Sequence, residues 1–222
     1  MESSSRHVHD TARADARQRD EWSIEFSRIV AFSDGVFAIA ITLLVLALEV
    51  PENADDLADS ILRQRGDVFA YALSFAVLGK LWMSHHRFFS VLDRFDGRLM
   101  ALNLLYLAFV ALVPYTSELL GDYGEQAPAV ILYAVGLAGV SLAFAAQIVY
   151  AYRAGLVKPE VRGAERRFAV PASFLVSAIF LASIPVALLS PDAAILMWLG
   201  IFLVGDRVTE RIGISLRPAD RG

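Results

Sequence analysis

The chain contains no cysteine among its 222 residues, so disulfide bonds and thiolate metal sites are excluded. Charged side chains are also missing from long stretches, although they make up 20% of the whole chain. Hydrophobic residues make up 56%, and the mean hydropathy is +0.51. The apolar residues form continuous blocks between short charged loops, unlike the amphipathic periods of soluble helices or the alternation of strands. This pattern is typical of an all-α polytopic membrane protein.

Six apolar segments are predicted as transmembrane helices. They cover residues 24–48, 68–86, 99–120, 129–152, 168–189 and 193–204. A helix needs about 20 apolar residues to cross the hydrocarbon core of a bilayer, so the short sixth segment leaves a full crossing open. We expect one six-helix transmembrane domain over 23–214, between a disordered cytoplasmic tail at 1–22 and a second cytoplasmic tail at 215–222.

The basic residues are distributed asymmetrically between the predicted loops. Seventeen of the twenty Lys and Arg residues fall at one end of the predicted bundle. They lie before or at the start of the first segment, in the loops after the second and fourth segments, and after the sixth segment. Only Arg63 and Arg65 fall at the other end, and Lys80 lies within the second segment. Because cytoplasmic loops carry an excess of Lys and Arg, this distribution predicts a multi-pass protein of the inner (plasma) membrane with both termini in the cytoplasm.

One carboxylate interrupts the first apolar segment. From Ile29 to Leu48 the chain has twenty residues, which as a helix of about 30 Å match the thickness of the hydrocarbon core. Asp34 lies inside this stretch, and Arg28 lies at its start. An ionisable side chain within a membrane helix costs about 2.5–3.5 kcal/mol or more, so it usually faces protein or water.

Two interpretations of this carboxylate are open. In the first, Ser33 or Asp34 caps the start of the helix, which leaves only about fifteen residues to cross the bilayer. In the second, the helix is continuous and Asp34 faces the interior of the bundle. We favour the second because of its length, and it places the partner of Asp34 on another helix, at Lys80, His85 or Asn103.

The signature Arg28-x-x-x-Phe32-Ser33-Asp34-Gly35, followed by the apolar run to Leu44, strongly resembles the transmembrane protein 175 family of potassium channels, in its bacterial branch. The stretch from Trp82 to His86 is similar to that family too, as is the third segment with Asn103 and Pro114-Tyr115. The resemblance implies a homotetramer of six-helix subunits around a central pore lined by the first helix. It also implies passive conduction of K⁺ and other monovalent cations across the lipid bilayer.

The resemblance further implies roles for nine residues. The narrowest ring of the family's pore maps onto Ile39, two further apolar rings map onto Leu43 and Leu46, and a hydroxyl ring that serves selectivity maps onto Thr42. A polar network that holds the first helix in place maps onto Arg28, Ser33, Asp34, Trp82 and His85.

The spacing of the four pore positions agrees with this map independently. Ile39, Thr42, Leu43 and Leu46 follow the i, i+3, i+4, i+7 pattern that places side chains on one helical face. Four copies around an axis would form a pore with mostly hydrocarbon walls, which stops ions by dewetting. On the residues alone, ordinary packing of an apolar helix face explains the same spacing.

Further absences limit the function. The chain has no Thr-Val-Gly-Tyr-Gly segment, so it cannot select K⁺ with stacked backbone carbonyls. Selectivity is expected to come from side chains and from the cost of partial dehydration. We find no nucleophile–base arrangement, metal-ligand cluster or phosphate-binding loop, so we predict no enzyme activity, no cofactor and no metal site. We also expect no nucleic-acid partner.

Two other functions stay open at this point. A small proton-coupled secondary transporter would use Asp34 and His85 as a proton relay. Transporters often carry inverted repeats, but the two halves of this chain show no clear repeat, and the signature around Asp34 occurs once. A scaffold without conduction would form a monomer or dimer without an axial path.

Overall fold

The computed structural model describes residues 24–51, 57–159 and 166–200. Both predicted tails, 1–22 and 215–222, and the end of the predicted domain lie outside these ranges. All regular elements of the described part are helices, and its one isolated bridge joins Leu92 and Val157, which confirms the all-α prediction. Its helices are the first helix (Ile24–Ala47, ending in the 3₁₀ turn η1, Leu44–Ala47), α2 (Leu57–Arg63), α3 (Arg65–Ser90), α4 (Gly97–Tyr123), α5 (Ala127–Arg153), α6 (Arg166–Leu189) and a final helix over 191–200.

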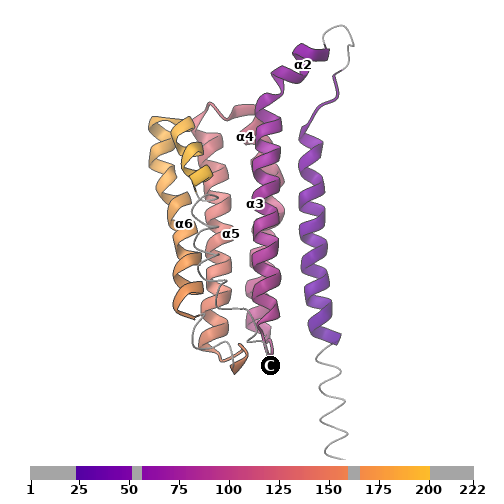
Figure 1. Ribbon diagram of the computed structural model, residues 1–222, viewed down its shortest axis with the longest axis vertical. Helices are drawn as coiled ribbons and strands as arrows, with labels where there is room; N and C mark the ends of the chain where they lie inside the picture. The colour runs from indigo at the N-terminus through magenta and orange to yellow at the C-terminus, as the bar shows by residue number, and fades with distance from the viewer. Residues whose placement is uncertain (1–23, 52–56, 160–165, 201–222) are drawn as a thin grey trace, which may run out of the picture.

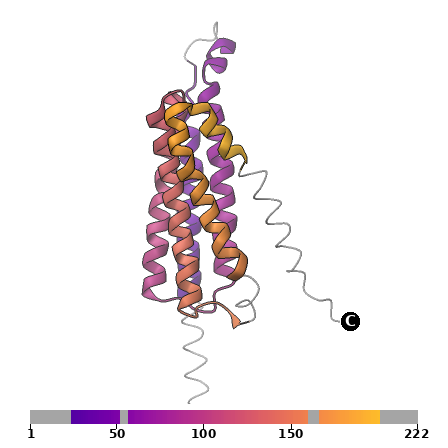
Figure 2. The ribbon, with the colours of Figure 1, turned by 90° about the vertical axis from the view of Figure 1, so that its left-hand side faces the viewer.

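The long helices run side by side in one bundle, with α6 at one edge and the first helix at the other (Figure 1). Within the bundle, α3 packs against α4, α4 against α5, and α5 against α6. The first helix contacts α3 and α4 through η1. Turned by 90°, the bundle shows α6 in front and the first helix behind (Figure 2). The first helix is therefore covered by its own subunit on one side only.

Three described helices are long and apolar enough to cross a membrane, namely the first helix, α4 and α5. The helix α3 has 26 residues, enough for a crossing by length, but its polar and charged side chains lower its hydropathy. Each predicted segment from the second to the fifth lies within an observed helix. The final helix begins at residue 191 and is helical to the end of the described range at 200.

The loop predicted between the first two segments is partly wrong, because it contains the short helix α2. Its seven residues, Leu57–Arg63, carry Leu57 and Ile61 one turn apart, which is a helical period. The guanidinium of Arg63 also donates to the hydroxyl of Ser60 at 2.7 Å. The stretch around α2 is rich in acidic residues, which is typical of a loop, so the sequence did not predict this short helix.

Close packing in the middle of the bundle depends on small residues of α5. A Cβ atom built on Gly139 would lie 2.5 Å from a ring carbon of Phe109 on α4, so any larger residue would force that ring to move. Ala134, Ala138 and Ala145 are buried on the same helix. Small residues let membrane helices approach closely, and here they bring α5 against α4.

The start of α4 is fixed by Asp96. One oxygen of its carboxylate accepts from the backbone N–H of Leu99 at 2.9 Å, and the other accepts from the hydroxyl of Tyr150 on α5 at 2.6 Å. The hydrogen bond from Tyr150 lowers the pKa of the Asp96 carboxyl below its usual value. The carboxylate is therefore charged at neutral pH, caps the helix, and complements the positive end of the α4 dipole.

Candidate functional site

The first helix has one face packed into its own subunit. This face consists of Ser33, Phe37, Ala40 and Leu44, all buried. Their spacing of four, three and four residues keeps them on one side of an α-helix. They pack against α3 and α4, and the ring of Phe37 lies 6.0 Å from that of Tyr106, centroid to centroid. This contact fixes how the helix is turned about its own axis.

The predicted pore residues lie on the uncovered side of the same helix. Ile39 is 61% exposed, Leu43 is 43% exposed and Leu46 is 74% exposed. Phe32, two turns before Ile39, is also exposed. The first helix therefore presents an apolar stripe, Phe32–Ile39–Leu43–Leu46, that no described part of its own subunit covers.

Thr42 lies beside this stripe and is exposed. Its hydroxyl donates to the backbone carbonyl of Ile39 at 2.9 Å. Because the single proton is used in this bond, the outward side of the oxygen carries lone pairs only. An exposed Thr42 can thus accept a hydrogen bond or contact a cation.

A chain of buried polar side chains joins the first helix, α3 and α4, nearer than Thr42 to the start of the first helix. The amide nitrogen of Asn103 on α4 donates to the Ser33 hydroxyl at 3.0 Å, and Ser33 donates to the carbonyl of Ile29 at 2.9 Å. The amide oxygen of Asn103 pairs with Nε2 of His85 on α3 at 2.9 Å. Since an amide oxygen only accepts, His85 must carry its proton on Nε2. Ser33, Asn103 and His85 form one buried triad.

Aromatic rings enclose the imidazole of this triad. The His85 ring stacks on Phe89 with 4.3 Å between centroids, and on Tyr106 with 5.4 Å. Phe37 of the first helix lies 5.8 Å away. The neighbouring His86 points outward and is exposed. The histidine pair therefore divides into one enclosed ring and one surface ring.

Asp34 is bonded to Trp82, and in the described part of the chain no hydrogen bond joins it to His85 or Asn103. The indole N–H of Trp82 donates to the Asp34 carboxylate at 2.8 Å, on the outer side of the contact between the first helix and α3. The helix is continuous through Asp34, as we favoured, and Ser33 bonds back to Ile29 and caps nothing. The expectation of His85 or Asn103 is wrong because Ser33 bonds to Asn103, and Asp34 lies one residue, about 100°, around the helix from Ser33. The pairing of Asp34 with Lys80 stays a prediction.

The structure thus brings four of the five predicted network residues into two separate contacts. Ser33 and His85 meet through Asn103, and Asp34 meets Trp82. Arg28 is exposed, and within the described ranges it joins neither contact. Arg28 lies on the same side of the helix as Phe32 and Ile39, four and eleven residues further along.

The sequence of the chain matches the family described as endosomal/lysosomal potassium channel TMEM175 over residues 28–114. A potassium channel of Streptomyces collinus is 38% identical over 158 residues, which are 66% of this chain and 77% of that protein. The chain belongs to the TMEM175 potassium channel family. This confirms the resemblance and the prediction that the chain is not an enzyme.

Two further relatives extend the likeness. A potassium channel of Chamaesiphon minutus is 42% identical over 125 residues, 54% of this chain and 61% of that protein. The crystal structure of a lysosomal potassium-selective TMEM175 homologue from Chamaesiphon minutus is 28% identical, with a TM-score of 0.73 over 85% of this chain and 98% of that chain. The TMEM175 sequence match contains all nine predicted site residues and ends at Pro114, whereas the structural likeness covers most of the bundle.

Two buried polar features of this TMEM175 chain were not predicted from the sequence. The first is Asn103, which was expected only as a partner for Asp34 and is the centre of the buried triad. The hydroxyls of Ser74, Ser117 and Tyr133 form a second buried cluster, with oxygens 2.7 Å and 2.9 Å apart. Both were marked in the sequence by polar residues within apolar helices, which require partners in a membrane.

Proposed function

We propose that the chain forms a homotetrameric channel of six-span subunits that conducts K⁺ passively. The observation that carries this proposal is the uncovered apolar stripe of the first helix, on the side where the family resemblance expects a pore. The potassium channels among the relatives of the chain support the choice of ion. The distribution of basic residues supports an inner-membrane location with both termini in the cytoplasm.

The stripe favours a shared pore over contact with lipid. Exposed leucines on α4, such as Leu104 and Leu112, are apolar side chains that suit lipid. The face of the first helix also carries the hydroxyl of Thr42 at mid-span and the guanidinium of Arg28 at its start. Polar groups within a membrane helix face protein or water, so this mixed face fits an aqueous axis.

In the proposed pore, four copies of Ile39 form the main constriction, and rings of Leu43 and Leu46 follow. A narrow ring of hydrocarbon cannot replace the hydration shell of an ion, so the barrier to conduction lies here. Thr42 offers four hydroxyl oxygens beside the constriction, each with its proton already donated to Ile39. These oxygens are the proposed source of selectivity, together with partial dehydration.

The two polar contacts serve as the support of the pore wall in this account. Ser33, Asn103 and His85 hold the inner side of the first helix, and Trp82 with Asp34 holds its flank. Arg28 completes the proposed network at the end of the pore, where its long side chain can reach a neighbouring subunit. A fixed rotation of the helix keeps Ile39 on the axis.

A flux assay tests the proposal. The full chain is reconstituted in liposomes that are loaded with K⁺, and the K⁺ efflux is recorded. Liposomes loaded with Na⁺ at the same concentration give the Na⁺ efflux for comparison. We expect efflux that protein-free liposomes lack, from a species of four subunits in detergent. Well-folded protein without K⁺ flux, or a monomeric or dimeric particle, would contradict the proposal.

The structure does not favour the proton-coupled transporter. Asp34 bonds to Trp82, and His85 bonds to Asn103, so no hydrogen bond joins the two proposed relay groups. The imidazole of His85 is also buried and stacked on the rings of Phe89 and Tyr106.

A further inference from the structure

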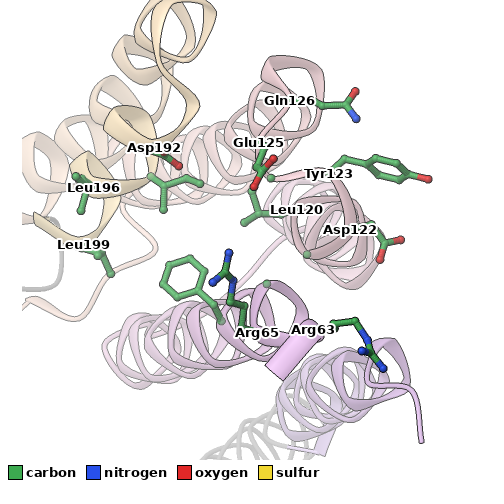
Figure 3. Close-up of a pocket in the computed structure, with 15 residues that line it drawn as sticks. Arg63, Arg65, Leu120, Asp122, Tyr123, Glu125, Gln126, Asp192, Leu196 and Leu199 are labelled. Carbon is green, nitrogen blue, oxygen red and sulfur yellow. The ribbon is translucent and has the colours of Figure 1, made fainter. Parts of the chain in front are cut away.

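A cavity of about 670 Å³ lies at the end of the bundle where α3 begins and α4 ends (Figure 3). Its walls come from the start of α3, the turn between α4 and α5, and the final helix. In the proposed topology this end faces the outside of the cell. Because α4 and the final helix end or begin here, the cavity is at the level of the lipid headgroups.

The upper part of the cavity carries charges of both signs. Arg65 reaches in from α3, Glu125 from the turn, and Asp192 from the final helix, whereas Arg63 and Tyr123 point away (Figure 3). All three inward side chains are exposed. Within the described ranges, none of them makes a hydrogen bond or an ion pair. Their charges are therefore available to a ligand with one anionic and one cationic group.

The lower part of the same cavity is apolar. Phe69 of α3 and Leu120 of α4 line it on one side, and Leu196 and Leu199 of the final helix on the other. Leu196 is 65% exposed, and Leu199 and Phe69 are partly exposed, each at least one helical turn further along its helix than the charged residues. The cavity thus changes from charged to apolar along the direction in which a phospholipid changes from headgroup to acyl chain.

We propose that this cavity binds a phosphatidylethanolamine molecule. Arg65 pairs with the phosphate, Glu125 and Asp192 accept from the ammonium, and the acyl chains lie against Phe69 and Leu196. The inference rests on the membrane placement in the proposed function and not on ion conduction.

The two carboxylates select the headgroup. The primary ammonium of ethanolamine has three N–H donors, which form charge-assisted hydrogen bonds with carboxylates. The trimethylammonium of choline has none, so the same site holds it by charge alone. An anionic glycerol headgroup brings no cation to Glu125 and Asp192 and leaves both carboxylates unpaired.

Lipid binding to the full chain in detergent tests this inference. Purified protein is mixed with equal amounts of dioleoyl phosphatidylethanolamine, phosphatidylcholine and phosphatidylglycerol, and retained lipid is counted by native mass spectrometry. We expect phosphatidylethanolamine to be retained about tenfold over phosphatidylcholine, as its charge-assisted hydrogen bonds imply. The double variant Glu125→Gln/Asp192→Asn is expected to remove this preference, and Arg65→Gln to lower retention of both zwitterionic lipids.

The matched control is Glu118→Gln, which neutralises an exposed carboxylate of α4 outside the cavity and is expected to keep the preference. Equal retention of the three lipids by the unmodified protein, or preference for phosphatidylglycerol, would overturn the inference, as would a preference that survives the double variant. Binding is measured without ion flux. A chain that retains phosphatidylethanolamine but conducts no K⁺ would remove the proposed function and leave this site standing.

Discussion

Replacing Ile39 with asparagine is expected to raise the K⁺ flux of the reconstituted protein by about tenfold or more, which corresponds to a barrier lower by about 1.4 kcal/mol. Ile39 is the proposed constriction, and its side chain is 61% exposed within the subunit. Asparagine is similar in size but offers an amide that binds water, so the ring stays hydrated and the dewetting barrier falls. The flux is measured in liposomes under K⁺ and Na⁺ gradients, where we also expect weaker discrimination between the two ions.

Leu112→Asn is the control for this substitution. Leu112 lies on α4 and is 52% exposed, so it places the same amide on a face outside the proposed pore. We expect its flux to equal that of the unmodified protein. Equal changes in the two variants, or no change at Ile39, would show that the stripe of the first helix does not line the ion path.

Replacing Asn103 with leucine is expected to lower the free energy of unfolding by about 1–3 kcal/mol, since buried polar partners are left unpaired. Leucine keeps the approximate volume of the side chain but removes both the donor to Ser33 and the acceptor for His85. The imidazole stacks on Phe89 and Tyr106 and is only 1% exposed, so solvent cannot easily replace that acceptor. Thermal unfolding in detergent measures the effect.

Trp82→Phe provides the comparison for this second substitution. It removes the hydrogen bond to Asp34 on the outer side of the same helix pair, where both groups are accessible. We expect a loss below about 1 kcal/mol, as for a hydrogen bond that solvent can replace. A larger loss in Trp82→Phe than in Asn103→Leu would contradict the view that the buried triad anchors the first helix.

The apolar blocks predicted the helices well because membrane spans have the strongest signal a sequence carries. The segments around α3, α4 and α5 were predicted a few residues short at each end. Those ends contain polar side chains such as Asp67 and Asp122, which hydropathy assigns to loops although the backbone stays helical. The same reliance on composition hid α2, whose helical period lies within an acidic stretch.

The partners of the polar residues could not be derived from depth alone. Asp34, Lys80, His85 and Asn103 lie at similar predicted depths, but a hydrogen bond also depends on how each helix is turned. A rotation of about 100° between neighbouring residues decides whether Ser33 or Asp34 meets Asn103. That rotation is set by the packing of Phe37 and Leu44 against α3 and α4, which an apolar helix does not reveal in its sequence.

The sequence could not predict the cavity at the end of the bundle either, because the residues that line it are far apart in the chain. Arg65, Glu125 and Asp192 fall in three separate predicted loops, where each one alone is an ordinary charged residue, although Arg65 and Asp192 lie in the first turns of helices in the structure. Only the folding of the final helix back over the bundle brings them to one opening. That fold depends on Trp198, which is buried against Tyr133 and donates to Ser183 at 2.9 Å.

The absence of cysteine allows a direct test of the central claim that the first helix lines the ion path. Ile39→Cys introduces the only thiol of the chain, and a cationic methanethiosulfonate reagent is added during K⁺ flux. If four copies of Ile39 surround the pore, the reagent abolishes the flux of this variant and leaves the unmodified protein and Leu112→Cys unaffected. Undiminished flux through a fully labelled Ile39→Cys protein would contradict the account.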